Sequence, residues 1–284
     1  MTGVVLVTGA SSGIGMETAT AAGTAGYQVV ATVRDPARTE VLRKSAADAG
    51  VDLDVEPLDV TDEDSMRACL ETVRTRYGRL DVLVNNAGRA NTFATIETCD
   101  LRRFRANLEV NFFGVVSMTK FALPLLRASG GRVVTIGATR GLIGQPFNEG
   151  YSAAKFAVEG FMESLAPTAA RMGVRLVMVV PGPVLGSSFG VNSGVTRESL
   201  LAEAGVYAPV LEPYLDWVAR QAWPGAQSPA EVAAVVVAAM SDPEPTFRVM
   251  TSDWARDYAA LKLKDPSGTV IAAMSASWLD EVQG

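Results

Sequence analysis

The chain has 284 residues, 48% of them hydrophobic and 20% charged, which predicts one large α/β domain over residues 1–284 with a sizeable core. Its net charge of −6 argues against nucleic acid or an anionic membrane surface as the main partner. Histidine is absent, so no metal site is expected, and acid–base chemistry falls to Tyr, Lys, Asp, Glu or Cys.

Two further features predict a cytoplasmic protein with no membrane span. Cys69 and Cys99 match neither a zinc pattern nor a disulfide framework, and they suit a reducing compartment. An apolar strand follows Met1 and Thr2 directly, without a signal-peptide pattern, and no apolar run approaches the roughly 18 residues of a membrane span.

The first predicted strand, residues 4–7, leads directly into the glycine-rich stretch TGASSGIG (8–15) and then into a helix at about 16–25. Glycines let the backbone turn tightly and approach a ligand closely. The start of a helix offers free N–H groups and a positive dipole end to a pyrophosphate. Placement between a strand and a helix therefore favours a phosphate-binding loop over a plain turn.

The second predicted strand, residues 28–33, ends where dinucleotide folds recognise the adenosine ribose. An acidic residue there binds the 2′-hydroxyl, whereas an arginine accommodates a 2′-phosphate. Val33 takes the place of the acid and Arg34 follows it, with Arg38 close behind. This favours NADP(H), although a shift of one residue would bring Asp35 to the ribose instead.

Strands and helices then alternate along almost the whole chain. Further strands are predicted at 51–58, 80–84, 133–136, 174–180 and 246–250, and further helices at 61–77, 98–126, 151–172 and 228–241, with one more in the tail. This order predicts a Rossmann-type, doubly wound parallel sheet of about seven strands with helices on both faces. Its site should lie at the carboxyl ends of the strands.

Tyr151 and Lys155 stand four residues apart at the head of one predicted helix, so their side chains share a face. An ammonium group near a phenol favours the phenolate and should lower the tyrosine pKa from about 10. Such a tyrosine can exchange a proton with an alcohol oxygen near neutral pH. Alone, this spacing is a weak signal.

Residues 184–227 show poor periodicity and mix Gly, Ser and Pro with large apolar side chains. A long irregular stretch in a compact domain is usually a lid or a binding loop. We therefore expect a substrate lid here with an apolar ligand beneath it, and a packed surface excursion is an equally good interpretation.

Five motifs occur in a fixed order: TGASSGIG at 8–15, NNAG at 85–88, Asn111, YSAAK at 151–155 and PGPV at 181–184. Together they closely resemble the short-chain dehydrogenase/reductase family over essentially the whole chain. The stretches VVATVRD, GLIGQPFNEGYSAAKFAVEGFMESLA and DPSG look most like its hydroxysteroid and retinol dehydrogenase branch. That resemblance implies NADP(H), a bulky apolar alcohol or ketone as substrate, and a homodimer or homotetramer formed through the helices that carry Asn111 and Tyr151.

The resemblance also implies a role for individual residues. Tyr151 would be the general acid in reduction, Lys155 would lower its pKa and bind the nicotinamide ribose, and Asn111 would hold a relay water. Substrate contacts would come from Gln145, Asn148 and Phe189. The cofactor would be held at its phosphates by Gly9, Ser11, Ser12, Gly13, Ile14 and Gly15, at its 2′-phosphate by Arg34, around its adenosine by Asp59, Val60, Asn86, Ala87 and Gly88, and at its nicotinamide by Pro181, Gly182 and Val184.

Two positions depart from the family pattern. Ala138 stands where the family has a catalytic serine, thirteen residues before Tyr151, and it has no hydrogen-bond donor. The stretch LGSS (185–188) replaces a threonine that contacts the nicotinamide, and Ser187 or Ser188 could substitute for it.

Three interpretations of Ala138 stay open. Thr139 could supply the missing hydroxyl. The serine of an active dehydrogenase could have been replaced to trap a bound substrate. Finally, the fold could have lost redox turnover and instead catalyse a non-redox step such as a cyclisation, or simply bind a ligand. The intact Asn111, Tyr151 and Lys155 favour a dehydrogenase, with activity reduced at the alanine.

Overall fold

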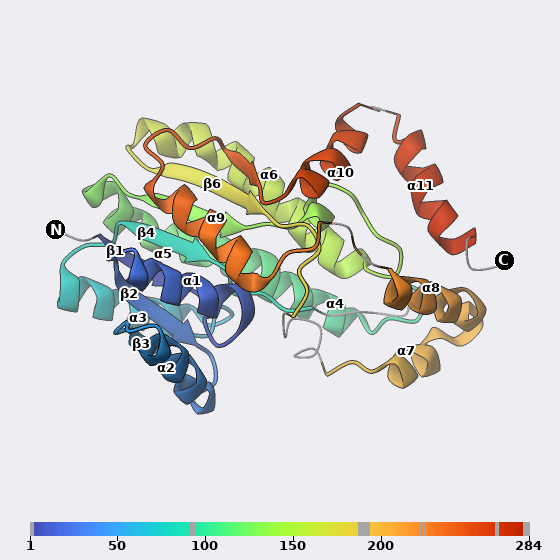
Figure 1. The fold of residues 1–284 in the computed structure, drawn as a ribbon, viewed down its shortest axis with the longest axis horizontal. Coiled ribbons are helices and arrows are strands. Elements are labelled where there is room, and N and C mark those ends of the chain that lie inside the picture. Colours follow the sequence, from blue (N-terminus) through green and yellow to red (C-terminus); the bar gives the residue numbers. More distant parts are fainter. Residues whose placement is uncertain are drawn as a thin grey trace.

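A seven-stranded sheet forms the centre of the protein in the computed structural model, which describes residues 3–90, 95–186, 194–221, 223, 225–264 and 267–280 (Figure 1). The strand order is β3-β2-β1-β4-β5-β6-β7, and every neighbouring pair is parallel. The predicted doubly wound parallel sheet is confirmed. Its strands are β1 (Val4–Val7), β2 (Gln28–Val33), β3 (Asp54–Pro57), β4 (Val82–Asn85), β5 (Arg132–Ile136), β6 (Arg175–Val180) and β7 (Arg248–Met250).

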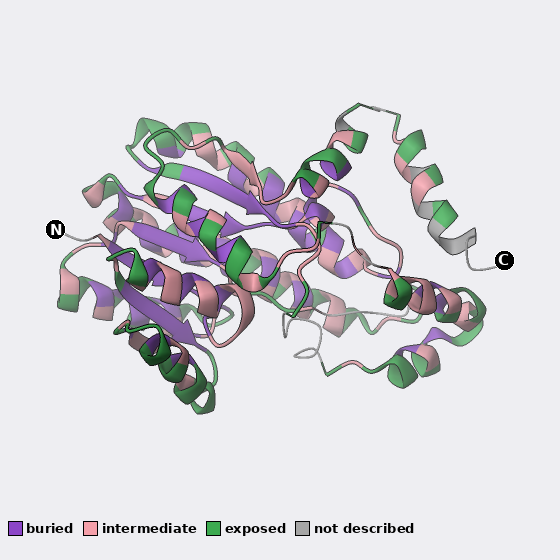
Figure 2. Cartoon of the chain, in the orientation of Figure 1, coloured by how far each residue is buried: buried purple, intermediate pink, exposed green. Residues whose placement is uncertain are grey.

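Helices cover both faces of the sheet because successive strand side chains point to opposite sides. In β1, Val4 and Leu6 join one hydrophobic cluster, while Val5 and Val7 join the other. The first cluster includes buried residues of α3 (Glu63–Tyr77), α5 (Gly114–Ser129) and α6 (Glu149–Arg171). The second includes those of α1 (Gly13–Thr24), α2 (Thr39–Asp48) and α9 (Pro229–Ser241). Figure 2 shows the strands buried between these two layers.

The expected irregular stretch at 184–227 contains two helices, so the sequence expectation is wrong in part. These are α7 (Arg197–Ala204) and α8 (Ala208–Arg220), and they lie beyond the carboxyl edge of the sheet (Figure 1). Their apolar side chains pack with Phe147 into a small cluster of their own. Gly205 ends α7, and Pro213 lies inside α8 without ending it; both residue types disfavour a helix, so the sequence of this stretch favours irregular structure.

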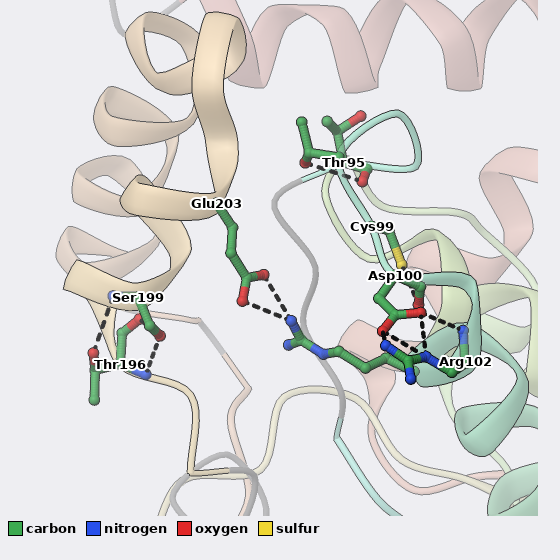
Figure 3. A network of polar contacts seen from close by, with 9 residues as sticks. Thr95, Cys99, Asp100, Arg102, Thr196, Ser199 and Glu203 are labelled. Carbon is green, nitrogen blue, oxygen red and sulfur yellow. Dashed lines mark hydrogen bonds and ion pairs between the residues drawn. The ribbon is translucent and has the colours of Figure 1, made fainter.

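Polar contacts tie these two helices to α4 (Leu101–Leu108) and to the residues before it. Arg103 donates two hydrogen bonds of 2.7 Å to the Glu203 carboxylate at the end of α7. Figure 3 shows Glu203 receiving this ion pair, with Asp100 and Arg102 paired nearby at the start of α4. The Tyr207 hydroxyl also bonds the Glu97 carboxylate. The helices are thus anchored over the edge where the site was predicted.

The predicted helix at 98–126 is interrupted. It runs as α4, one π-helical turn at Glu109–Phe113 that contains Asn111, and then α5. By length and apolar composition alone, the run Leu101–Ser129 is long enough to cross a membrane. Here α5 packs against α3 and β4 as a core helix. The tail holds two helices rather than one, α10 (Asp253–Leu263) and α11 (Thr269–Asp280).

An ion pair fixes the edge strand β7 to α6. Arg248 of β7 donates hydrogen bonds of 3.1 and 2.7 Å to Glu159 of α6, whose side chain is only 7% exposed. The other carboxylate oxygen of Glu159 is buried without a hydrogen-bond partner. Arg248 is therefore the cation that compensates a nearly buried carboxylate close to Lys155.

We expect Arg248→Met to lower the free energy of unfolding by about 3–5 kcal/mol, because Glu159 is left charged, buried and unpaired. Urea denaturation measures this change. Adding Glu159→Gln to Arg248→Met should restore most of the loss, since the uncompensated charge is then gone. A single variant within about 1 kcal/mol of the wild type would show that the pair contributes little.

Candidate active site

A cleft of about 720 Å³ opens at the carboxyl ends of the parallel strands. It is lined by the turn between β1 and α1, by the ends of β2, β4, β5 and β6, and by the start of α6. The structure therefore brings most of the predicted site together. The predicted residues that line the cleft are Gly9, Ser11, Ser12, Gly13, Ile14, Arg34, Asp59, Val60, Asn86, Ala87, Gly88, Ala138, Asn148, Tyr151, Lys155, Pro181, Gly182 and Val184.

The glycine-rich turn requires glycine for two separate reasons. Gly9 and Gly13 have φ values of 68° and 57°, in the left-handed region that favours glycine. A Cβ on Gly9 would also lie 2.8 Å from Cα of Ala87. Gly15 does not line the cleft. A Cβ there would lie 2.3 Å from Nδ2 of Asn86, so close packing requires glycine at this position, and its predicted contact with a phosphate stays a prediction.

Hydrogen bonds lock this turn to the end of β4. The Thr8 hydroxyl accepts from the backbone N–H groups of Asn86 and Ala87, at 3.0 and 2.9 Å. In return, Nδ2 of Asn86 donates to the carbonyl oxygens of Thr8 and Gly9, both at 2.9 Å. The NNAG segment thus fixes the conformation of the glycine-rich turn. The two segments that line the cleft here are therefore held in place by each other.

The first turn of α1 fits an anionic group. The helix begins at Gly13, its N-cap Ser12 makes no side-chain capping bond, and its first turn contains no acidic residue. Its N–H groups and positive dipole end therefore face the cleft without a carboxylate or hydroxyl cap to compensate them. The pyrophosphate of a dinucleotide matches this donor set.

At the end of β2, Arg34 and Asp35 are the two candidates for contact with the adenosine ribose, and their surroundings differ. Asp35 caps a short 3-10 turn, because its carboxylate accepts from the backbone N–H of Ala37 at 3.0 Å. Arg34 is exposed, lines the cleft and pairs with no carboxylate among the residues that the structure describes. Arg38 lines the same end. This end of the cleft therefore holds two guanidinium groups, of Arg34 and Arg38, together with the carboxylates of Asp35 and Asp59.

Tyr151 and Lys155 lie together on α6, as the spacing predicted. Lys155 is 7% exposed, and its Nζ donates a 2.8 Å hydrogen bond to the carbonyl oxygen of Ile136 at the end of β5. The same Nζ lies 5.8 Å from the centre of the Tyr151 ring. The bond to β5 fixes the ammonium group at the edge of the sheet, next to the tyrosine.

The pKa of Tyr151 moves against the sequence expectation. Burial raises it to about 12, and the nearby Arg140 guanidinium opposes that rise. Burial also lowers the pKa of Lys155 to about 8, and the Glu159 carboxylate opposes this change. Desolvation of the charged form therefore outweighs the effect of the neighbouring charge at both residues, Arg140 at Tyr151 and Glu159 at Lys155. The Tyr151 phenol holds its proton near neutral pH in this structure.

Asn111 is buried but does not line the cleft. Its Oδ1 accepts from the backbone N–H of Arg89 at 3.0 Å, and its Nδ2 donates to the Arg89 carbonyl at 2.9 Å and to Asn107. The side chain is thus committed to holding the segment after β4. Its predicted role in a water relay stays a prediction.

The predicted substrate contacts divide three ways. Asn148 lines the cleft, whereas Gln145 does not, although its Oε1 accepts from Asn148 at 3.4 Å. Phe189, together with Ser187 and Ser188, lies outside the described residues.

Several lining residues were not predicted from sequence; those with large or charged side chains are Leu58, Arg89, Val110, Ile136, Arg140, Leu185, Trp223 and Trp254. Arg140 follows two residues after Ala138, so its nearness to the end of β5 was available as a signal. Trp254 belongs to α10, in a part of the chain with no motif. Its ring packs closely against Gly182: a Cβ on that glycine would lie 3.1 Å from Cε3 of Trp254.

Comparison with known proteins agrees with this geometry. The family model described as short chain dehydrogenase matches residues 3–193. Retinol dehydrogenase 8 of Bos taurus is 35% identical over 285 residues, covering 95% of this chain and 88% of the relative. The 17-beta-hydroxysteroid dehydrogenase type 1 of Homo sapiens is 36% identical over 275 residues, covering 94% and 82%. A crystal structure of an actinorhodin polyketide ketoreductase variant with NADPH has a TM-score of 0.72 and 31% identity, covering 88% and 95%.

The lowered pKa of Lys155 predicts a pH-dependent contribution to stability. Its folded value is about 8 and its ordinary value is 10.5, so the unfolded chain binds more protons between these limits. The free energy of unfolding should therefore rise with pH in this window, by at most about 3 kcal/mol relative to Lys155→Met. Urea denaturation at pH 7, 8, 9 and 10 measures both proteins. Parallel pH profiles would contradict the buried, charge-disfavouring environment of Lys155.

Proposed function

The chain belongs to the short-chain dehydrogenase family, and we propose that it is an NADP(H)-dependent oxidoreductase acting on a bulky apolar carbonyl or secondary alcohol. The observation that carries this proposal is that one cleft contains both the predicted cofactor residues and the Tyr151–Lys155 pair. One end holds Arg34 beside the glycine-rich turn, and the other holds the pair Tyr151 and Lys155. A dinucleotide that spans the cleft reaches both ends.

Three observations support NADP(H) over NAD(H). The Asp35 carboxylate is used in capping a turn, and the neighbouring Arg34 has no carboxylate partner in the described part of the chain. Arg38 adds a second positive charge at the same end of the cleft. The similar ketoreductase structure contains NADPH. Two guanidinium groups suit a 2′-phosphate, whereas a ribose hydroxyl needs an acceptor.

In reduction, the bound cofactor supplies a hydride to the carbonyl carbon of the substrate. Tyr151, protonated near neutral pH, donates its phenolic proton to the oxygen that gains negative charge. Lys155 is held at the Ile136 carbonyl, from which its ammonium group stabilises the tyrosinate left behind. Because its pKa is raised, Tyr151 is better suited to donate a proton in reduction than to accept one from an alcohol in oxidation.

The far end of the cleft supports an apolar substrate. Trp223, Trp254 and Leu185 line it, and the apolar cluster of α7 and α8 lies beyond. We propose that α7 and α8 act as the substrate lid. The similar proteins are named for retinol, a hydroxysteroid and a polyketide, and ligands of these classes have large carbon skeletons.

Ala138 keeps a second candidate function open. It lines the cleft and offers no hydrogen-bond donor to a substrate oxygen. A redox-inactive protein that binds the cofactor and catalyses a non-redox step, or only binds a ligand, would share every other feature of the site. Thr139 also lines the cleft and is the neighbouring hydroxyl that could act in place of the missing serine.

Restoring the hydroxyl discriminates between the two functions. Ala138→Ser should raise kcat for NADPH-dependent ketone reduction by about 10²–10³, because one donor to a developing oxyanion contributes about that much. NADPH oxidation with steroid, retinoid and polyketide-like ketones measures it. Tyr151→Phe in the Ala138→Ser background is the control and should abolish the gain. If neither the wild type nor the Ala138→Ser variant oxidises NADPH above background, the redox-inactive alternative is favoured.

Removing the charge at the adenosine end tests the cofactor preference. Arg34→Ala should weaken NADPH binding by about tenfold or more and leave NADH binding nearly unchanged, since only NADPH carries the 2′-phosphate. Calorimetric titration of each cofactor measures the two effects. Equal losses for both cofactors would show that Arg34 does not contact the 2′-phosphate.

We also propose a cytoplasmic homodimer or homotetramer, formed through the long helices. Leu101 and Phe113 on the α4–α5 run are about half exposed, which leaves apolar surface for a second copy to cover. Cys69 and Cys99 are unpaired, as suits a reducing compartment. Light scattering after size-exclusion chromatography should give the mass of two or four chains, and Phe113→Asp should reduce it. A wild-type monomer would refute this assembly.

A further inference from the structure

Arg140 is a cation in the substrate end of the cleft that the proposed reaction leaves without a task. It lies in a 3-10 turn, Thr139–Gly141, directly after Ala138, and it lines the same cleft as Tyr151 and Trp254. Its side chain is half-buried. The nearest recorded partner is the Tyr258 hydroxyl, to which Nη1 donates a long hydrogen bond of 3.5 Å.

No carboxylate pairs with this guanidinium in the part of the chain that the structure describes. Within that part, the carboxylates that line the cleft are Asp35 and Asp59, and both belong to the adenosine end. Asp35 caps a turn, and Asp59 accepts from the backbone and the hydroxyl of Thr61. Among the described residues, Arg140 thus makes no ion pair. The Glu149 carboxylate, whose Oε2 is buried without a hydrogen-bond partner, acts on the pKa of Tyr214 in the direction opposite to Arg140 but does not pair with Arg140.

Aromatic side chains surround Arg140, so leaving its charge without a counter-charge is energetically unfavourable. Trp254 and Tyr258 of α10 stack at 4.7 Å between ring centres and form an apolar wall beside it. The Arg140 charge opposes the rise in pKa that burial causes at Tyr151, Tyr214 and Tyr258, so the guanidinium lies near phenols of α6, α8 and α10. A guanidinium among aromatic rings is weakly solvated, and an anion gains more there than in water.

Other groups in the cleft are placed to bind the anionic groups of the cofactor. The first turn of α1 faces the pyrophosphate position, and Arg34 and Arg38 stand at the adenosine end. Arg140 follows β5 on the opposite side, next to the tyrosine that would donate the proton. The ligand that reaches it is therefore the substrate.

We propose that Arg140 is a specificity-determining residue that binds an anionic group on the substrate, so that the enzyme prefers ketones or alcohols that carry a carboxylate beside an apolar body. This rests on the proposed oxidoreductase function and narrows its substrate class. Guanidinium and carboxylate match as a planar, bidentate pair, which fixes the orientation of the carbonyl as well as its affinity.

A pair of ligands that differ only in charge tests the proposal. Para-benzoylbenzoate and its methyl ester are diaryl ketones of nearly the same shape, and meta-benzoylbenzoate changes the spacing between ketone and acid. Calorimetric titration into the NADP-bound protein measures binding without requiring turnover. The wild type should bind at least one acid about tenfold to a hundredfold more tightly than its ester.

Three variants separate a contact from a general charge effect. Arg140→Met should bring acid and ester to equal affinity, chiefly by weakening the acid. Arg140→Lys should keep part of the preference, because the charge remains without the bidentate geometry. Arg171→Met removes the same charge from the exposed end of α6 and should leave the preference intact.

The outcomes distinguish this inference from the proposed function. An ester that binds as well as its acid, a preference that survives Arg140→Met, or no binding of either ligand would overturn the role of Arg140. So would an equal loss of kcat for both ligands in Arg140→Met with the preference unchanged, which would assign Arg140 to the reaction itself. Charge-selective binding without NADPH oxidation, in the Ala138→Ser background as well, would refute the oxidoreductase function and leave anion recognition in place.

Discussion

The hydrogen-bonded contact between the β1–α1 turn and the end of β4 is the constraint on which the rest of the site depends. Thr8 and Asn86 exchange bonds across it, and Gly9 and Gly15 allow two backbones to approach more closely than a Cβ permits. Because β1 and β4 are neighbours in a parallel sheet, their carboxyl ends meet where the chain leaves the core. The cofactor end of the cleft is a consequence of this contact.

Burial decides the chemistry at the other end. Lys155 is almost enclosed and reaches the Ile136 carbonyl, so its ammonium group is well placed but poorly solvated. The same enclosure keeps Tyr151 protonated. The pair is therefore a protonated phenol beside a cation, and the Glu159 carboxylate and the Arg248 guanidinium continue this alternation of charges. Charge compensation at α6 thus connects the edge strand β7 to the end of the cleft that holds Tyr151.

The doubly wound parallel sheet and the glycine-rich turn after β1 were predictable because they depend on local periodicity and on motifs at strand ends. The helices α7 and α8 were not, since Gly205 and Pro213 are residues that disfavour helices, and the apolar faces are covered by each other and by Phe147, which is distant in sequence. Asn111 illustrates a different limit. Its polarity inside a helix indicated a special role, but only the fold reveals that Arg89 and Asn107 occupy its side chain.

The sequence by itself determined the doubly wound sheet, the family resemblance, the Tyr151–Lys155 pair and the missing hydroxyl at Ala138, because each follows from residue type and spacing along one chain. The tertiary structure alone decided that Asp35 is used as a cap, that burial outweighs the cation at Tyr151, and that Trp254 reaches the cleft from the C-terminal helices. It also decided that Arg140 faces the substrate end without a carboxylate partner among the described residues. Solvation and pairing depend on neighbours far apart in sequence, and only folding brings those neighbours together.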